Sequence, residues 1–417
     1  MLRSFAISFI VILTSIFLIR YFVYSNRSQT ANVQQVWWQV QSIDTMKYSR
    51  DLSRQMLNDP AFDTTIDMQV GNIAKTGATH VAIATPYDEE FIPILSRWVA
   101  ASRRYNLHVW FRGNFSGWEQ WFGYPKISGD EHVQKTDDFI RNHPDLFVDG
   151  DIFTPCPECE NGGPGDPRQT GDVAGFRRFL IHEHQVAAND FVSIHKNVST
   201  SYNSMNYDIA TLVMDPATTR AVGGVVAIDH YVETPIDLVT NIQALATRSN
   251  GKIFLGEFGV PIPDINGTMN DDQQATWIDD ALNKLSLMPI VIGVNYWVNV
   301  GGSTQMWSDN GTAKPAVGVI TQYYTPKILH GSVYDQYNSP IANVEVSTSY
   351  KTAKTDAYGQ FILPILPSDK TVFVHTSKYD DTETQISSDD TNIHIIITKI
   401  PKSFFDAILG YINGFLH

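Results

Sequence analysis

Carboxyl side chains that follow apolar segments are the residues of this sequence best suited to chemistry. Glu257 stands in Gly256-Glu257-Phe258-Gly259, directly after an apolar run. Burying a charge without a partner is costly, so this carboxylate is expected either to do nucleophilic or acid–base chemistry or to form a salt bridge at a rim. Glu158 and Glu160 follow a second such segment, in which Pro157 precedes the first Glu and Cys159 the second.

Eight β-prone segments that alternate with helical patterns must position these side chains. One helical stripe joins Phe91, Ile94, Leu95, Trp98 and Val99. Such alternation predicts an α/β fold, here a (β/α)8 TIM barrel over residues 36–326. A doubly wound open sheet is the alternative, but no Gly-rich phosphate-binding turn follows the first segment. The expected strands are Val36–Asp44, His80–Thr85, His108–Gly113, Asp151–Pro155, Asn197–Asn203, Val225–Tyr231, Lys252–Gly256 and Ile290–Trp297.

The motif around Glu257, at the end of the seventh segment, resembles the nucleophile motif of clan A glycoside hydrolases, especially the cellulase-type family. The resemblance covers residues 36–326 and implies cleavage of β-glycosidic bonds with retention of configuration. It makes Glu257 the nucleophile and a Glu at the end of strand four the acid/base, with Glu158 fitting that place better than Glu160. A retaining enzyme needs its two carboxyl groups about 5–5.5 Å apart. The clan usually has Asn directly before the acid/base, to contact the sugar 2-hydroxyl, where this chain has Pro157.

Other expected strand ends supply candidate substrate-binding residues, because the active site of a barrel lies at the carboxyl ends of its strands. The resemblance implies that Tyr231 orients the nucleophile, although it is nearly as compatible with a core position, and that Trp297 forms a platform beneath the sugar. Arg112 could bind hydroxyls, hold Glu257 ionised or form a structural ion pair. Further candidates are Asn114, His230 and Trp118, the last as compatible with packing as with an outer sugar subsite, with Asn203, Asn206 and Asp44 as weaker ones.

The chain has only two cysteines, Cys156 and Cys159, in Cys-Pro-Glu-Cys. A redox role would need a thioredoxin-like βαβ context, and a zinc site would need two further ligands. A disulfide across the local loop, or two packed thiols, is the favoured interpretation. No cofactor and no metal are expected.

The charge balance excludes one class of partner. Thirty Lys and Arg against 44 Asp and Glu give a net charge of −14, which argues against nucleic acid as a partner. A neutral carbohydrate remains compatible, and a monomer is expected. Two alternatives stay open: a non-catalytic carbohydrate-binding surface protein on a degenerate barrel, and a metal-dependent barrel hydrolase, which would need converging His or Asp ligands.

The two ends of the chain predict a membrane tether and an accessory unit. Residues 1–25 read as an uncleaved transmembrane signal anchor and 26–35 as a linker, so the barrel is expected outside the cytoplasm, or secreted if the anchor is cleaved. Residues 327–400 predict a small antiparallel β-sandwich. It resembles the carboxypeptidase regulatory-like domain through Gly331-x-Val333, Pro340-Ile341-x-Asn343-Val344 and Thr355-Asp356-x-x-Gly359-x-Phe361. Residues 401–417 predict an amphipathic helix.

Overall fold

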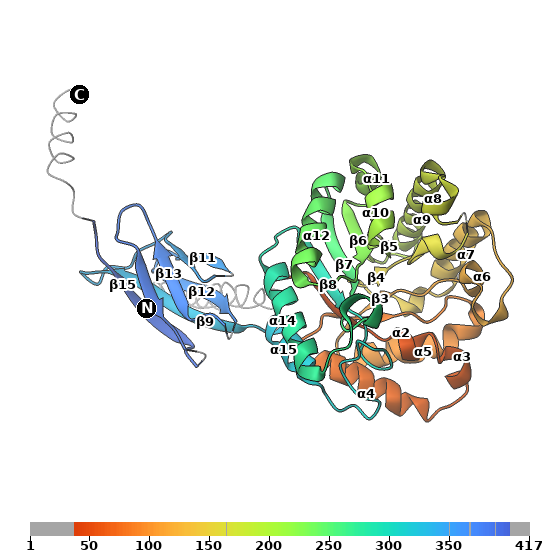
Figure 1. The fold of residues 1–417 in the computed structure, drawn as a ribbon, viewed down its shortest axis with the longest axis horizontal. Helices are drawn as coiled ribbons and strands as arrows, with labels where there is room; N and C mark the ends of the chain where they lie inside the picture. The colour runs from red at the N-terminus through yellow and green to blue at the C-terminus, as the bar shows by residue number, and fades with distance from the viewer. Residues whose placement is uncertain (1–36, 164, 350, 367, 388, 401–417) are drawn as a thin grey trace, which may run out of the picture.

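The structure is a computed structural model that describes residues 37–400 apart from 164, 350, 367 and 388 (Figure 1). The expected anchor at 1–25, the linker at 26–35 and the helix at 401–417 therefore lie outside the described residues. Within the described part, none of the helices combines the length and the apolar character that crossing a bilayer requires.

The larger unit is built on one sheet of eight parallel strands, as predicted. The strand order is β4-β3-β2-β1-β8-β7-β6-β5, so the first and last strands of the unit pair with each other and the sheet curls round. The strands are β1 (Val40–Asp44), β2 (His80–Ile83), β3 (His108–Phe111), β4 (Ile152–Phe153), β5 (Ser204–Asn206), β6 (Val225–Asp229), β7 (Lys252–Phe258) and β8 (Val291–Tyr296).

The fifth strand differs from the prediction of Asn197–Asn203. Ser199 forms a parallel bridge with Ile152 of β4, and its carbonyl accepts from the Phe153 N–H at 2.9 Å. The chain then leaves the ladder, because the Tyr202 carbonyl accepts a bond from the Thr154 hydroxyl at 2.6 Å instead. It resumes at Ser204 beside β6. The predicted segment thus closes the ring against β4, whereas β5 itself comes one step later.

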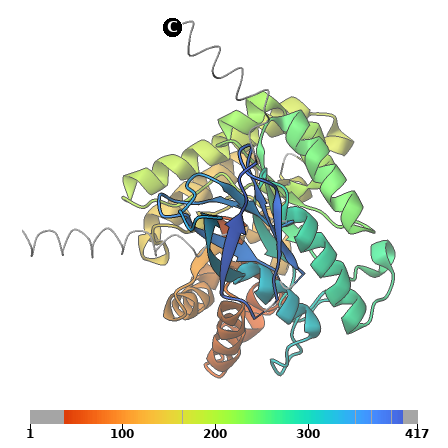
Figure 2. The same cartoon turned by 90° about the vertical axis from the view of Figure 1, so that its left-hand side faces the viewer.

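Helices follow the strands and surround the sheet, as Figure 2 shows along the length of the molecule. The longer helices bury an apolar stripe; the predicted stripe of α5, which begins at Phe91 just before the helix and runs to Val99, is buried. The described α-helices of this unit are α2 (Met46–Ser49), α3 (Ser53–Met56), α4 (Phe62–Lys75), α5 (Ile92–Arg104), α6 (Ser116–Glu119), α7 (Gly129–Asn142), α8 (Pro167–Thr170), α9 (Val173–Ser193), α10 (Tyr207–Val213), α11 (Pro216–Ala221), α12 (Pro235–Ser249), α13 (Pro263–Asn266), α14 (Asp271–Ser286) and α15 (Pro315–Tyr324).

A small cluster fills the inside of the ring. Trp110 and Tyr202 each pack edge to face with Phe254, with ring centroids 4.9 and 4.8 Å apart. Gly293 leaves room for this packing, because a Cβ there would lie 2.5 Å from the Phe254 ring. The interior is therefore a packed core and no pore, which is typical of a TIM barrel.

The smaller unit is a pair of sheets with its own apolar core. One sheet has the order β11-β10-β13-β14 and the other β12-β9-β15, and the prediction of a purely antiparallel sandwich was wrong, since β15 runs parallel to β9. The strands are β9 (Lys327–Asp335), β10 (Glu345–Ser347), β11 (Thr352–Lys354), β12 (Gln360–Ile365), β13 (Thr371–His375), β14 (Thr382–Gln385) and β15 (Asn392–Ile397).

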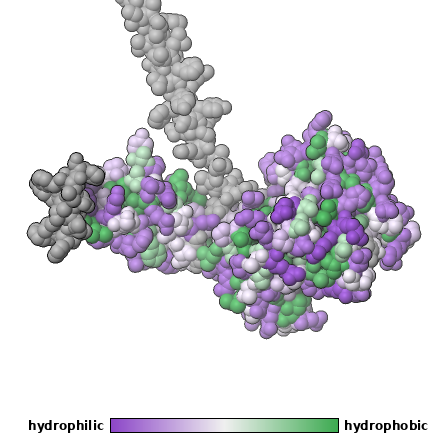
Figure 3. Space-filling model, turned by 90° about the horizontal axis from the view of Figure 1, so that it is seen from above, coloured by the Kyte–Doolittle hydropathy of each residue, from purple (hydrophilic) through white to green (hydrophobic). Residues whose placement is uncertain are grey.

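This unit joins the barrel at the end where the strands begin. The Lys351 ammonium lies 4.6 Å from the ring centroid of Trp37, just before β1, and Leu366 packs into the barrel's outer core. The described surface of both units mixes hydrophilic and hydrophobic residues (Figure 3). The carboxyl ends of the strands, where barrel sites lie, are at the opposite end.

Candidate active site

A buried ion pair between Glu257 of β7 and Arg112, which follows β3, forms the centre of the site. Arg112 Nη1 donates to Glu257 Oε1 at 2.7 Å, and the two side chains are 1% and 8% exposed. The strands deliver both residues to the same end of the ring. Of the interpretations that the sequence left open for Arg112, the geometry supports direct pairing with the Glu257 carboxylate.

Arg112 also binds three other groups on the barrel axis. Nη1 donates to Asp44 Oδ2 at 2.7 Å, and Nη2 donates to Asp229 Oδ2 at 3.0 Å and to Ser204 Oγ at 3.2 Å. Three carboxyl groups share one guanidinium, so burial and the charge of Glu257 raise the pKa of Asp44 and of Asp229. Burial alone would lower the pKa of Arg112, but the charges of Asp229, Glu257 and Asp44 outweigh it and raise that pKa.

Tyr231 and Trp297 complete the surroundings of Glu257. The Tyr231 hydroxyl donates to Glu257 Oε2 at 2.7 Å, and burial together with the Glu257 charge raises its pKa far above the ordinary value, which keeps the proton on the phenol. Trp297 meets Tyr231 edge to face at 6.1 Å between ring centroids. The indole N–H of Trp297 is buried without a hydrogen-bond partner in the described part of the chain.

Glu158 lies in the turn after β4 and faces the same centre. Its backbone is left-handed, with φ 44° and ψ 49°, a conformation that costs a non-glycine residue roughly 1–2 kcal/mol. Its N–H donates to the Ser204 carbonyl at 2.8 Å, which ties the turn to β5. Its side chain accepts long bonds from Asn206 Nδ2 at 3.4 Å and Asn161 Nδ2 at 3.2 Å.

The surroundings of Glu158 favour its protonated form. Burial, then the charges of Glu257 and Glu160, raise its pKa to about 7. The Glu257 charge acts on Glu158 more strongly than that of Glu160, two residues away in the chain, although β7 and β4 lie on different sides of the ring. One carboxyl group is thus ion-paired and the other holds a proton near neutral pH.

Glu160 occupies a different place from Glu158. Its Oε1 accepts from the backbone N–H and the Nδ2 of Asn206, both at 2.9 Å. Its Oε2 is buried and has no hydrogen-bond partner within the described residues. Burial raises its pKa while the bonds from Asn206 lower it. Glu160 is therefore fixed against β5, whereas Glu158 is held only by long bonds.

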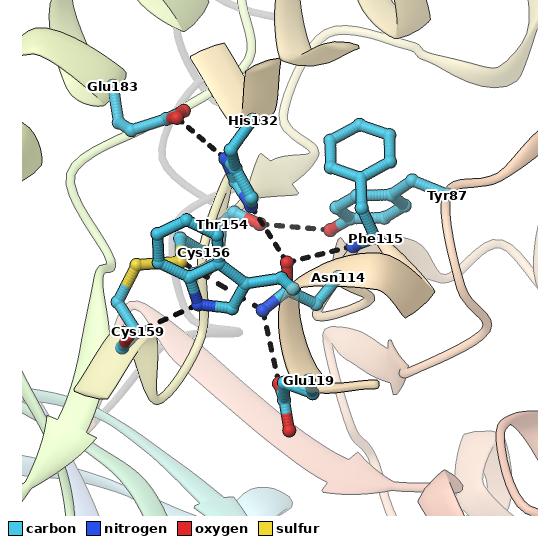
Figure 4. The surroundings of a disulfide bond; sticks show 10 residues. Tyr87, Asn114, Phe115, Glu119, His132, Thr154, Cys156, Cys159 and Glu183 are labelled. Atoms are coloured by element: carbon cyan, nitrogen blue, oxygen red, sulfur yellow. Dashed lines mark hydrogen bonds and ion pairs between the residues drawn. A yellow bond between two sulfur atoms is a disulfide. The ribbon is translucent and has the colours of Figure 1, made fainter. Parts of the chain in front are cut away.

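A further carboxyl group, that of Glu119 at the end of α6, was not predicted. Burial and the charge of Glu158 raise its pKa to about 8. Asn114 donates from Nδ2 to Glu119 Oε1 at 3.1 Å, and its own Oδ1 contacts His132 Nε2 at 2.8 Å (Figure 4). His132 Nδ1 contacts Glu183 Oε1 at 2.6 Å. Asn114, a predicted sugar contact, thus orients the carboxyl group of Glu119. The sequence signal that pointed to this region was the position of Asn114 after an apolar strand.

Three other predicted residues lie away from this centre. Trp118 has no exposed surface and stacks on Phe179, so of its two interpretations, outer sugar subsite or packing, the structure has packing. The His230 ring stacks on Tyr207 and contacts Asn241 on the helix side, where burial lowers its pKa to about 4. Asn203 is buried and bonds to the Thr200 carbonyl at 3.4 Å.

Cys156 and Cys159 form a disulfide that spans Pro157 and Glu158. Of the interpretations left open, the structure therefore has the local loop disulfide. No group of three or more His, Cys, Asp or Glu side chains suited to a metal ion occurs among residues 37–400 as described.

Comparison with known proteins gives similarity in fold. No family model matches the chain, and no curated protein matches it in sequence. GH5_18 from Bifidobacterium longum subsp. longum is 16% identical, over 72% of this chain and 85% of that chain, with a TM-score of 0.51. A variant of it in complex with Manb1-4GlcNAc is 14% identical, over 72% and 84%, with a TM-score of 0.52.

A third solved structure is similar to the same extent. The variant of GH5_18 from Streptomyces cattleya in complex with Manb1-4GlcNAc is 13% identical, over 71% of this chain and 84% of that chain, with a TM-score of 0.52. Identities this low show the fold alone. The chain is a TIM-barrel protein whose barrel is of the kind found in these glycoside hydrolases.

Proposed function

We propose that this chain is a retaining glycoside hydrolase that cleaves β-glycosidic bonds through Glu257 as nucleophile and Glu158 as acid/base. The observation that carries the proposal is the difference between these two carboxyl groups at one end of the ring. Glu257 is ion-paired with Arg112, whereas Glu158 holds its proton to about pH 7, partly because of the Glu257 charge. A double displacement needs one carboxylate and one carboxylic acid.

In the first step, a Glu257 oxygen attacks the anomeric carbon while Glu158 gives its proton to the departing glycosidic oxygen. Arg112 and Tyr231 hold the two Glu257 oxygens, so the carboxylate is aimed before the sugar binds. In the second step, Glu158 takes a proton from water, which attacks the anomeric carbon and releases Glu257.

The same charge interaction would adjust Glu158 for both steps. While Glu257 is free, its charge raises the pKa of Glu158 and favours the acid. Once Glu257 is esterified by the sugar, that charge is gone and the pKa of Glu158 falls, which favours the base. One residue can therefore serve as acid and then as base without any movement of the chain.

For the substrate, we propose a β-linked neutral sugar, with β-mannosides as the first to test. The support is indirect: two solved structures with a similar barrel hold Manb1-4GlcNAc. On this chain, Trp297 is only partly buried and meets Tyr231 edge to face, so its ring is placed to contact a sugar beside Glu257.

The proposal is tested with β-manno-, gluco- and xylo-oligosaccharides and the matching aryl glycosides, with the anomeric configuration of the first product followed by NMR. Retention is expected, and turnover should fall at least a thousandfold in Glu257→Gln. Glu345→Gln, an exposed Glu on β10, is the matched control and should keep wild-type turnover. Inversion, or activity that survives in Glu257→Gln, would overturn the proposal.

The same experiment distinguishes the non-catalytic alternative. The missing Asn before Glu158 motivates it, since a binder could dispense with recognition of the 2-hydroxyl. A binder would hold oligosaccharides in calorimetry but turn over none of them, and Glu257→Gln would change nothing in turnover.

We also propose that the chain acts as a monomer outside the cytoplasm, tethered by its N-terminal segment, with residues 327–400 as an accessory unit of the carboxypeptidase regulatory-like type. The disulfide supports this location, because such bonds persist in oxidising compartments. Recovery of the full chain in the membrane fraction, with the barrel open to external protease, is the expected result.

A further inference from the structure

The disulfide is a feature that the two-carboxylate mechanism leaves unexplained. It joins Cys156 and Cys159, whose Cα atoms are 5.1 Å apart, and the two residues between them are Pro157 and Glu158. The proposed acid/base therefore stands inside a covalent loop of four residues. Both cysteines are 1% exposed, so the bond lies beneath the site and not on its surface.

The backbone of Glu158 needs such a restraint. Its φ of 44° lies in the left-handed region, which glycine adopts easily and glutamate does not. The hydrogen bonds on its side chain are long, at 3.2 and 3.4 Å, and do not fix the carboxyl group by themselves. The position of this carboxyl group must then come mainly from the turn that carries it.

The surrounding side chains hold the disulfide in place. Asn114 Nδ2 lies 3.9 Å from Cys156 Sγ, and the Trp118 indole N–H donates to the Cys159 carbonyl at 3.2 Å. Trp118 stacks on Phe179 with the planes 7° apart. Figure 4 shows the two sulfur atoms with Asn114 beside them. The buried Trp118, which is unsuited to a sugar platform, acts instead as an anchor for this turn.

We propose that the Cys156–Cys159 disulfide is a positioning element for Glu158, so that opening it impairs the acid/base steps and leaves the nucleophile and the fold in place. This rests on the proposed function for its kinetic consequence. A bond across so few residues restricts the unfolded chain little compared with one that closes a long loop, so its effect should be local.

The cysteine content of the chain allows the disulfide to be reduced selectively. It has only these two cysteines, so a reductant can act on no other bond. Dithiothreitol would attack one sulfur as a thiolate, form a mixed disulfide and then close to its own cyclic disulfide. The protein gains two electrons and two thiols, and dithiothreitol supplies those electrons and is oxidised.

The first measurement compares the wild type with Cys156→Ala/Cys159→Ala on two aryl glycosides of β-D-mannose, or of whichever panel sugar the wild type cleaves. The 4-methoxyphenol group of the first glycoside needs a proton from the acid in order to leave. In the Ala variant, kcat/KM for this substrate should fall at least tenfold, because general acid catalysis contributes about 10²–10⁴-fold. The 2,4-dinitrophenolate group of the second glycoside leaves without protonation, so kcat/KM for that substrate should change less than threefold. Azide should raise turnover of that substrate in the variant and yield the glycosyl azide.

Equal losses on both glycosides, or no loss on either, would overturn the proposal. Dithiothreitol should reproduce the variant's pattern in the wild type once two thiols per chain are titrated, and it should leave the Ala variant unchanged. If the buried disulfide resists the reductant, the Ala variant decides alone. A melting temperature within a few degrees of the wild type excludes general unfolding as the cause.

A second measurement needs no activity. The Glu158 carboxyl carbon is assigned by comparison with Glu158→Gln and titrated by NMR in both proteins. Its midpoint, near pH 7 in the wild type, should fall by at least half a unit in the Ala variant, because the carboxyl group leaves its buried place beside Glu257. An unchanged midpoint contradicts positioning by the disulfide, whereas a shifted midpoint without turnover on any glycoside contradicts only the proposed function.

Discussion

Arg112 Nη1 lies 2.7 Å from Glu257 Oε1, and the guanidinium is fully enclosed by the ring of strands. Arg112→Met removes the shared cation and leaves Asp44, Asp229 and Glu257 without it. We expect the free energy of unfolding at pH 7 to fall by about 3–5 kcal/mol, the usual cost of breaking a buried pair. Urea denaturation measures this fall.

The control for this change is Arg104→Met, which breaks the exposed pair with Asp67 and should cost less than about 1 kcal/mol. Equal losses in the two variants would mean that the central network is not a special determinant of stability.

Tyr231→Phe tests the second contact of Glu257. The variant loses one hydrogen bond to a charged group, worth about 1.5–3 kcal/mol, so kcat/KM should fall roughly ten- to a hundredfold. Tyr207→Phe also removes a hydroxyl bond, to the Asn241 carbonyl at 3.3 Å, and serves as control with little expected effect. Wild-type kinetics in Tyr231→Phe would remove Tyr231 from the machinery.

The pH dependence of kcat/KM reports on Glu158. The first step needs the protonated acid, so kcat/KM should decline as pH rises through about 7. In Glu160→Gln one of the charges that raise the pKa of Glu158 is gone, so this basic limb should move to lower pH. Glu89→Gln, at an exposed position, should leave the limb in place. Complete loss of activity in Glu160→Gln would make Glu160 the acid instead.

Stability should decline in acid because of His80. Burial lowers its folded pKa to about 4 from 6.5, so the neutral form is favoured in the folded state. Above pH 6.5 both states are neutral; below it the unfolded chain binds a proton first, and stability is lost until about pH 4. The loss amounts to roughly 3 kcal/mol. Between pH 7.5 and 4.5, the free energy of unfolding should fall less in His80→Gln than in the wild type. In His375→Gln, a change at an exposed position, it should fall as much as in the wild type.

The eight parallel strands could be predicted because buried strands are encoded by short runs of apolar residues. Glu257, Arg112 and Tyr231 could be located because they lie at the ends of such runs. The fifth strand was misplaced because Ser199 pairs with one neighbour and Ser204–Asn206 with the other, and no local pattern encodes that division. Strand ends fix which side chains reach the centre, but hydrogen bonding fixes how the chain divides between neighbours.

Loops were the least predictable part of the site. Glu119 reaches Glu158 only because the chain after β3 folds back through α6, and its partner Asn114 depends on His132 from α7. Trp118 follows a strand end, as a sugar platform would, yet Phe179 from α9 covers it. Long-range packing of this kind leaves no trace in the spacing of a single sequence.

The central claim is that Glu257 carries the sugar between the two steps. A 2-deoxy-2-fluoro-β-glycosyl fluoride of the sugar that the enzyme cleaves should inactivate it with time. The fluorine at C2 slows both steps, whereas the fluoride leaving group speeds only the first, so the glycosyl-enzyme accumulates. Digestion and mass spectrometry should then place one glycosyl group per chain on the peptide that contains Glu257, and Glu257→Gln should remain unlabelled. A label on Glu158, Glu160 or another carboxylate, with Glu257 unmodified, would contradict the account.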